Sequence, residues 1–272
     1  MLAIIDNSSH FIQAFMSLSL LSFPENLSDL AVLDAEAWQT VTAGEPVAAA
    51  AWMLVAARLG HGDAQSILGQ WLLDGHGVER EPSAALAWFL KAGTQGHVIG
   101  MNMAGRCFEN GWGTSPDAFA AANWYRQAAH KGLEAGMYNY ANMLSTGNGV
   151  RKDPTAALEW YRRAARLGHA KSMTKIGHFY EDGRVVRKDV EAAFTWFEKG
   201  AQGGDFRGQF NYASMLAARG QPLLALEWLK KVPLTATPGY KRLAGEQLLQ
   251  SPNPDFQAVG RAMLEAVSPL PA

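Results

Sequence analysis

The chain has 272 residues, and 48% of them are apolar, which is enough for the packed core of one or two domains. Its 24 basic and 25 acidic residues give a formal net charge of −1, which excludes a uniformly basic nucleic-acid-binding protein and a disordered acidic chain. The single cysteine excludes an internal disulfide framework and a cysteine-rich zinc module, and it favours a reducing compartment.

The first predicted element is the apolar run at residues 11–23 (FIQAFMSLSLLSF). It has the length of a signal-peptide core, but no basic residue precedes Arg58 and no small-x-small cleavage site follows before Pro24. The run is also too short and too rich in serine to cross a bilayer. We therefore predict an amphipathic helix inside a helical cap over residues 1–44, and neither an export signal nor a transmembrane segment.

The central part of the chain is periodic. Tryptophan recurs five times at intervals of 36 residues, and a glycine follows each tryptophan after eight residues. Small residues recur 12 and 17 positions after each tryptophan, and glycine recurs 23 positions after four of them. Such a period is typical of stacked supersecondary units. These repeat markers are Trp52, Trp88, Trp124, Trp160 and Trp196, with Gly60, Gly96, Gly132, Gly168 and Gly204.

Each repeat unit is predicted to contain two helices. In the fourth unit a helix begins at Pro154, after Asp153, and ends at Gly168. A second helix covers about residues 169–182 and ends at Gly183. The tryptophans and neighbouring alanines are expected to point into the stack. One such helix pair cannot bury its own apolar face, so stacked copies forming an all-α solenoid are predicted.

Two of the units resemble the Sel-1-like repeat, a relative of the tetratricopeptide repeat. The resemblance rests on residues 120–153 (AAANWYRQAAHKGLEAGMYNYANMLSTGNGVRKD) and 156–189 (AALEWYRRAARLGHAKSMTKIGHFYEDGRVVRKD). It implies a right-handed α-solenoid with five 36-residue repeats over residues 45–222. Because the motif residues are packing residues, the resemblance identifies the fold more strongly than the function.

The repeat weakens towards the C-terminus. Trp228 follows Trp196 by 32 residues rather than 36, so the loop between Ala217 and Pro222 is predicted to be shortened. Prolines then interrupt the chain, which leaves helices near residues 240–250 and 255–267. We predict that residues 223–272 form a degenerate sixth unit and a C-terminal helical cap, continuous with the rest of the solenoid.

Three features invite a chemical interpretation, and each has a simpler structural one. His61, His97 and His169 occupy one repeat column, where successive copies are about 10 Å apart and cannot share a metal, so a role at the start of the second helix is favoured. Cys107 occupies a column of core residues. The G-x-G-V runs at residues 75–78 and 147–150 follow helices and lack a Gly-Lys-Ser/Thr ending, so we interpret them as turns rather than phosphate loops. No catalytic residue, metal site or cofactor is predicted, although paired carboxylates that meet only in the folded chain remain an alternative.

Charge is divided unevenly along the chain. Residues 1–90 contain two basic and ten acidic residues, a net −8, whereas residues 91–272 contain 22 and 15, a net +7. In related solenoids the first helices line the concave face, and a groove bearing arginine there suits carboxylate or phosphate groups of a partner; the alternative is an ordinary solvated face. The candidate partner-binding residues on these helices are Asn123, Arg126, Gln127, Glu159, Arg162, Arg163, Arg166 and Lys199.

Two further candidates lie in loops. Trp112 stands where the other copies have small or polar residues, so it either packs against a neighbouring unit or serves as an exposed anchor for a partner. The basic residues around Arg151 and Lys152, and around Arg187 and Lys188, are interpreted as solvated loops.

We predict a cytoplasmic, non-enzymatic adaptor that holds a protein or peptide partner, which could be an enzyme that it assists, in its concave groove. The rival hypothesis is an accessory or regulatory subunit that uses its caps or convex face, or a homo-oligomer formed through the −8/+7 polarity. An enzyme with a site built from several units is a third, weaker hypothesis. The interruption of basic residues by acidic ones argues against nucleic acid, and no membrane partner is expected.

Overall fold

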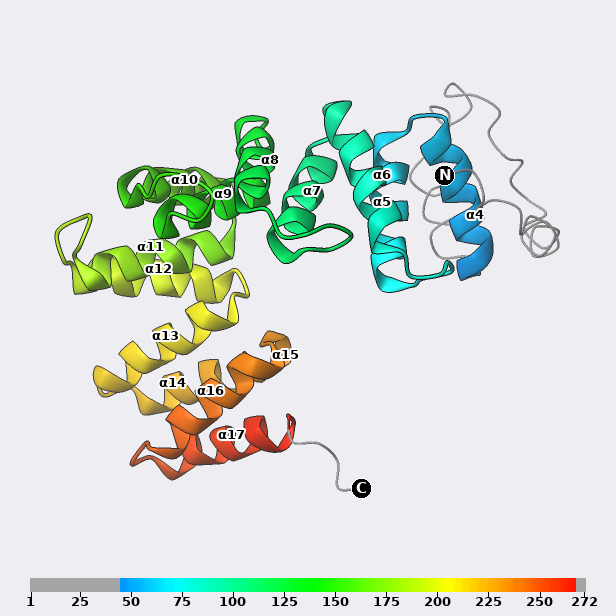
Figure 1. The fold of residues 1–272 in the computed structure, drawn as a ribbon. Helices are drawn as coiled ribbons and strands as arrows, with labels where there is room; N and C mark the ends of the chain where they lie inside the picture. Colours follow the sequence, from blue (N-terminus) through cyan, green and yellow to red (C-terminus); the bar gives the residue numbers. More distant parts are fainter. Residues whose placement is uncertain (1–44, 268–272) are drawn as a thin grey trace. The chain divides into compact units, whose positions relative to one another are not determined.

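The computed structural model describes residues 45–267, and every regular element in this range is a helix (Figure 1). Helices that carry the repeating tryptophan, here called the tryptophan helices, alternate with second helices of the same length. This confirms the predicted all-α fold of helix–turn–helix repeats. The tryptophan helices are α4 (Pro46–Arg58), α6 (Pro82–Thr94), α8 (Ala118–His130), α10 (Pro154–Arg166) and α12 (Val190–Gln202). The second helices are α5 (Gly62–Asp74), α7 (Val98–Asn110), α9 (Glu134–Thr146), α11 (Ala170–Asp182) and α13 (Phe206–Ala218).

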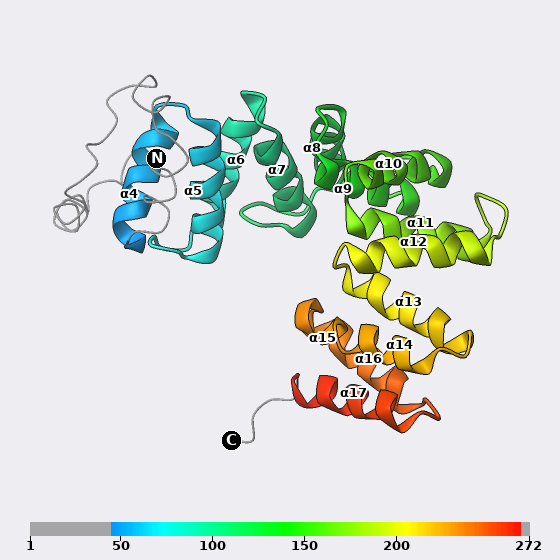
Figure 2. The ribbon, with the colours of Figure 1, turned by 180° about the vertical axis from the view of Figure 1, so that it is seen from behind.

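The chain divides into two compact units. The first contains α4 to α8, the part of α9 up to Met143, and the loop Gly147–Lys152. The second contains Leu144–Thr146 and the chain from Asp153 onwards, which includes α10 to α17. Within each unit, helices that follow one another in the chain pack side by side, as α5, α6 and α7 do in the first unit and α11, α12 and α13 in the second (Figure 2).

Local sequence signals set the ends of the helices as predicted. In the fourth repeat, Pro154 begins α10 and the Asp153 carboxylate accepts a hydrogen bond from the Ala156 N–H at 2.9 Å. This bond satisfies one of the free N–H groups of the first turn. At the end of α11, Gly183 has a φ of 71°, a left-handed conformation that favours glycine. The repeating glycines of the turns therefore act as helix stops.

The deepest core position is the residue that follows each tryptophan. Phe89, Tyr125 and Phe197 are fully buried there, each against a glycine of a second helix. A methyl group added at Gly177 would lie 2.6 Å from Phe197 Cδ1, so only glycine fits. We expected the tryptophans themselves to point into the stack, but only Trp52 is buried, and the four that follow in the column are half-buried because this aromatic neighbour fills the deep position.

The C-terminal helices pack against the end of the second unit. Only three residues separate α13 from α14 (Pro222–Leu229), against seven between α11 and α12, so the predicted shortening of the loop is confirmed. The helices predicted near residues 240 and 255 are α16 (Pro238–Leu249) and α17 (Pro254–Glu265), each beginning slightly earlier because a proline occupies its first turn. The short helix α15 (Val232–Thr235) was not predicted.

The predicted N-terminal cap, residues 1–44, lies outside the described residues, as does its apolar run at 11–23. No helix within residues 45–267 has both the length and the apolar character needed to cross a membrane.

Candidate partner-binding site

Within each unit, the second helices contact one another more extensively than the tryptophan helices do. Helix α5 contacts α7, and α11 contacts α13, whereas α6 and α8, like α10 and α12, share fewer contacts. In a curved stack of helix pairs, the more closely spaced layer lies on the inner side. The contacts therefore favour the second helices as the inner layer and the tryptophan helices, which carry most of the predicted binding residues, as the outer layer.

Several tryptophans support a cation three residues further along the chain. In the second unit, the Arg163 guanidinium lies 4.6 Å from the centre of the Trp160 ring, and Lys199 Nζ lies 4.6 Å from that of Trp196. The shortened sixth repeat keeps the arrangement, with Lys231 Nζ 3.8 Å from Trp228. Such contacts hold a cation by the charge distribution of the ring and leave its net charge in place. We call Arg163, Lys199 and Lys231 the tryptophan-backed cations.

Arg162 and Glu159, by contrast, neutralise one another. Their side chains form an ion pair at 2.6 Å, and Arg162 also donates a hydrogen bond to the Tyr180 hydroxyl at 3.2 Å. Tyr180 lines a shallow surface hollow with Arg187 and Lys188, from the basic loop that we interpreted as solvated. Arg162 and Glu159, both predicted to bind a partner, therefore lie together but bind each other.

The remaining predicted residues of the tryptophan helices are dispersed. Asn123 accepts a hydrogen bond from Arg126 at 2.9 Å on the exposed face of α8, and Gln127 is half-buried on the same helix. Arg166 is exposed in the last turn of α10, close in sequence to Arg163. Helix α8 belongs to the first compact unit and α10 to the second.

Trp112 is partly buried rather than projecting freely. Its ring packs against the apolar core of the first unit, and the Arg106 guanidinium lies 5.1 Å from the ring centre. The backbone N–H of Trp112 donates a hydrogen bond to the Cys107 carbonyl at 2.9 Å, in the turn that ends α7. The sequence allows two alternatives for Trp112, packing and exposure as an anchor. Most of its side chain is packed against neighbouring residues, and the remainder is exposed.

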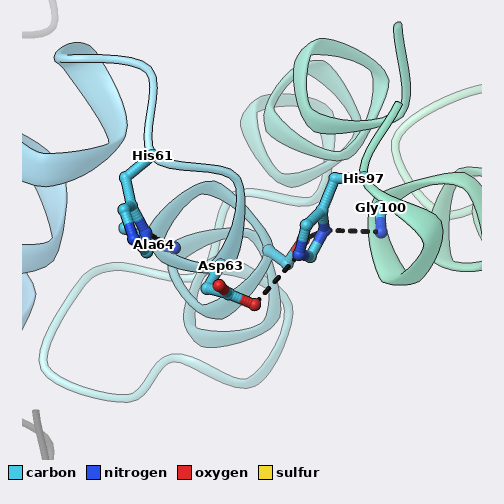
Figure 3. Close-up of polar contacts among 6 residues, drawn as sticks. His61, Asp63, Ala64, His97 and Gly100 are labelled. Atoms are coloured by element: carbon cyan, nitrogen blue, oxygen red, sulfur yellow. Dashed lines mark hydrogen bonds and ion pairs between the residues drawn. The ribbon is translucent and has the colours of Figure 1, made fainter. Parts of the chain in front are cut away.

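The histidine column caps the second helices. Nδ1 of His61, His97 and His169 accepts a hydrogen bond from the backbone N–H three residues later, at 3.3 Å in each case. His97 also lies with Nε2 2.9 Å from the Asp63 carboxylate (Figure 3). The predicted structural role is confirmed, and no group of three metal-ligating side chains occurs among residues 45–267.

Cys107 has the environment of a core residue. It is fully buried, and desolvation raises the pKa of its thiol to about 11, an effect that the positive charge of Arg106 partly offsets. A thiol in this state is protonated at neutral pH and is a poor nucleophile. The G-x-G-V runs form turns after helices, as predicted, and Gly75, Gly77, Gly147 and Gly149 all have positive φ there.

The inner layer of the second unit holds polar residues that the sequence analysis did not select. Lys175 on α11, Arg207 on α13 and Tyr240 on α16 interact there, close to the buried carboxylate of Asp205. The available signal was a set of basic residues on successive second helices, at positions 171, 175 and 207. Because the first helices are the ones expected from the sequence to line the groove, these cations of the second helices are not among the predicted residues.

A family model of the Sel1 repeat matches residues 43–61, 62–97, 98–133, 135–169 and 170–205, which together exceed half of the chain. The chain belongs to the Sel1 repeat family. The four longer matches each begin close to a second helix, so a tryptophan helix comes second in the family unit. Counted from this starting point, the tryptophan helices, which we expected to line the concave face as first helices, are the second helices of the family unit. Sel1 repeats generally mediate protein–protein interactions and are typically non-catalytic.

Solved structures share the fold. A Sel1 repeat protein from Oxalobacter formigenes is 27% identical, with a TM-score of 0.71, and the match covers 86% of this chain and 96% of that one. A protective antigen of uropathogenic Escherichia coli with an SLR fold is 23% identical, with a TM-score of 0.64 and coverage of 85% and 52%. An immunity protein from Pseudomonas aeruginosa is 17% identical, with a TM-score of 0.54 and coverage of 76% and 80%. No curated protein matches the chain.

Proposed function

We propose that this Sel1 repeat protein is a non-catalytic, cytoplasmic scaffold that binds a protein or peptide partner through acidic or phosphate-like groups on that partner. The repeat signature itself is used in packing, since the glycines close turns or admit aromatic rings. Side chains that remain exposed are the ones free to differ between repeats and to recognise a partner. The general role of Sel1 repeats in protein–protein interaction supports the same class of function.

The observation that carries the proposal is that the tryptophan-backed cations are held by aromatic rings and have no carboxylate partner among the described residues. Among the described residues, no carboxylate oxygen lies within 4.0 Å of Arg163, Lys199 or Lys231, whereas Arg162 and Arg219 each pair with a glutamate. The first three cations therefore keep an uncompensated charge while a ring restricts their side chains. Restricting a side chain before binding lowers the entropy lost on association, and complementary charge favours acidic partners.

Charge reversal at this surface tests the proposal. The variant Arg163→Glu/Arg166→Glu and the matched control Lys230→Glu/Arg261→Glu change the net charge equally, and all four residues are exposed. Each protein is affinity-purified from its native host, and circular dichroism verifies that the helical content is unchanged. We expect the partner to be lost from the first variant and kept by the control. Recovery of the same partners with both variants contradicts the assignment of the surface, and recovery of no partner with the unmodified protein contradicts the scaffold role.

A second candidate function is an accessory subunit or self-associating protein that uses its outer layer. It is favoured by the placement of the charged tryptophan helices and by the −8/+7 division of charge along the chain. Electrostatic self-association weakens as salt shortens the screening length from about 10 Å at 0.1 M to about 3 Å at 1 M. Sedimentation velocity at both salt concentrations distinguishes the two candidates. A larger species at low salt supports self-association, and a monomer in both conditions excludes it.

A further inference from the structure

Helices α11 and α13 come into close contact on the inner layer of the second unit. A methyl group added at Gly208 of α13 would lie 2.7 Å from Thr174 Oγ1 of α11 and 2.8 Å from the carbonyl carbon of Gly200, and both distances are shorter than a van der Waals contact. The absence of a side chain at Gly208 therefore lets α13 approach both the Thr174 side chain of α11 and the backbone of α12. Lys175 and Arg207 are the neighbours of Thr174 and Gly208 on these two packed helices, and their charges act on one another across the junction.

The junction concentrates positive charge. Lys175 is half-buried, and its burial together with the positive charge of Arg207 lowers its pKa below the ordinary lysine value, while Asp205 opposes this effect. Lys171 is exposed one helical turn before Lys175 and lies on the same face of α11. Lys175 is partly desolvated and is repelled by the exposed Arg207, and this repulsion costs folding free energy unless an anion lies between the two cations.

Aromatic rings hold Arg207 in place. Its guanidinium carbon lies 4.5 Å from the centre of the Phe206 ring and 5.3 Å from that of Tyr240, and the two rings are 4.8 Å apart. Tyr240 comes from α16, so a C-terminal helix helps to position this arginine. A guanidinium stacked in this way keeps its hydrogen-bonding edge available for a planar carboxylate.

The Asp205 carboxylate, which acts on Lys175 through its charge, contacts neither cation and caps α13 instead. One oxygen of Asp205 accepts a hydrogen bond from the Gly208 N–H at 3.1 Å, which caps α13, and Asp205 is only 5% exposed. Its other oxygen has no hydrogen-bond partner within the described chain. Neither Lys175 nor Arg207 lies within 4.0 Å of any carboxylate oxygen of residues 45–267. The chain thus positions the two cations without supplying an anion that contacts them.

We propose that Lys175 and Arg207 form a subsite on the inner layer of the second unit that binds an acidic side chain, aspartate or glutamate, of a partner protein. This inference rests on the proposed scaffold function and assigns to it a second contact, on the opposite layer from the tryptophan-backed cations. The bound carboxylate accepts hydrogen bonds from the Lys175 ammonium and the Arg207 guanidinium, and it relieves the repulsion between them. Lys171 adds a further cation for a neighbouring acidic residue of the same segment.

Titration with a defined acidic peptide tests this subsite. The probe is a fluorescent hexaglutamate with an acetylated N-terminus and an amidated C-terminus, so only side-chain carboxylates are offered, and binding is followed by fluorescence anisotropy in 50 mM salt. Hexaglutamine serves as the uncharged reference. Replacing both cations, as Lys175→Met/Arg207→Gln, is expected to weaken hexaglutamate binding by about tenfold or more, because charge-assisted hydrogen bonds are lost. The matched variant Lys230→Met/Arg261→Gln removes two exposed cations and is expected to change binding by about twofold at most.

Three results overturn the subsite: no hexaglutamate binding by the unmodified protein, equal loss in the two double variants, or no loss in either. If Lys175→Met/Arg207→Gln loses its helical content, the single variant Arg207→Gln, at an exposed position, is compared with Arg261→Gln, and equal binding by these two overturns the proposal. Because the titration contains no cellular partner, its outcome is independent of the affinity purification. Failure of the subsite and failure of the scaffold function are therefore distinguishable.

Discussion

His97 and Asp63 connect two successive repeats of the first unit. The Nε2 atom of His97 lies 2.9 Å from Asp63 Oδ1, while Nδ1 accepts a hydrogen bond from the Gly100 N–H, as Figure 3 shows. Ser66 Oγ, also on α5, lies 3.0 Å from the same Nδ1. One imidazole thus caps α7 and joins it to the second helix of the preceding repeat.

Removing this imidazole is expected to destabilise the first unit. His97→Ala should lower the free energy of unfolding by about 1–2 kcal/mol, because α7 loses its N-terminal cap and the contacts with α5 are broken. Asp63→Asn retains a hydrogen-bond acceptor at an exposed position and should cost less than about 1 kcal/mol. Urea unfolding followed by circular dichroism measures both. Equal stability of His97→Ala and the unmodified protein would contradict the assigned role.

Gly177 should not tolerate even a methyl group. In Gly177→Ala the new Cβ collides with the buried Phe197 ring, and such overpacking costs about 1–3 kcal/mol. Gly239→Ala is the matched control, since no atom lies within 4 Å of a Cβ built there. Thermal unfolding should show a lower midpoint for the first variant only. If the unfolding midpoint of Gly177→Ala equals or exceeds that of Gly239→Ala, the described packing of Gly177 against Phe197 is wrong.

Cys107 should react with thiol reagents only when the first unit unfolds. Its side chain is fully buried, and its pKa of about 11 leaves about 0.1% thiolate at pH 8. Because it is the only cysteine, an Ellman assay reports on this site alone. We expect negligible reaction in buffer and one equivalent in concentrated urea. Rapid stoichiometric reaction of the folded protein is incompatible with the described core.

Tyr212 should make stability sensitive to alkaline pH. Burial and the hydrogen bond from its hydroxyl to the Glu198 carboxylate, at 2.9 Å, raise its pKa to about 12, above the ordinary value of about 10. A raised pKa in the folded state gives stabilisation that is complete below pH 10 and is lost as the pH rises through 12. Tyr212→Phe should therefore be less stable by about 1–2 kcal/mol at pH 8, and this difference should narrow by pH 11. A difference that is constant from pH 8 to pH 11 contradicts the linkage.

The sequence predicts the helices well because their boundaries depend on local chemistry. The proline and aspartate at the start of α10 and the left-handed Gly183 after α11 act within a few residues of the chain. The 36-residue period then supplies the same local signals in each repeat. Shortening of the loop before α14 is visible for the same reason, as a change in the spacing between Trp196 and Trp228.

The candidate sites are less predictable because they depend on how helices stack. Periodicity marks which residues recur, but the burial of Phe197 rather than Trp196 depends on the glycine opposite it in a second helix. Lys175 and Arg207 are 32 residues apart, whereas the repeat is 36 residues long. They therefore fall in different repeat columns, and an alignment of the repeats does not bring them together. Which helices form the inner layer is likewise inferred from the contacts between helices, and the order of helices within a repeat does not indicate it.

The central claim, that the tryptophan-backed cations contact a protein partner, is tested most directly by photo-crosslinking in the native host. A photoreactive amino acid replaces Thr195, which is exposed on α12 four residues before Lys199, and in a control it replaces Gln247, which is exposed on α16. We predict one crosslinked protein at position 195 that is absent at position 247 and is lost when Arg163→Glu/Arg166→Glu is added. Equal crosslinking at both positions, or a crosslink at position 195 that the charge reversal leaves unchanged, would contradict the account.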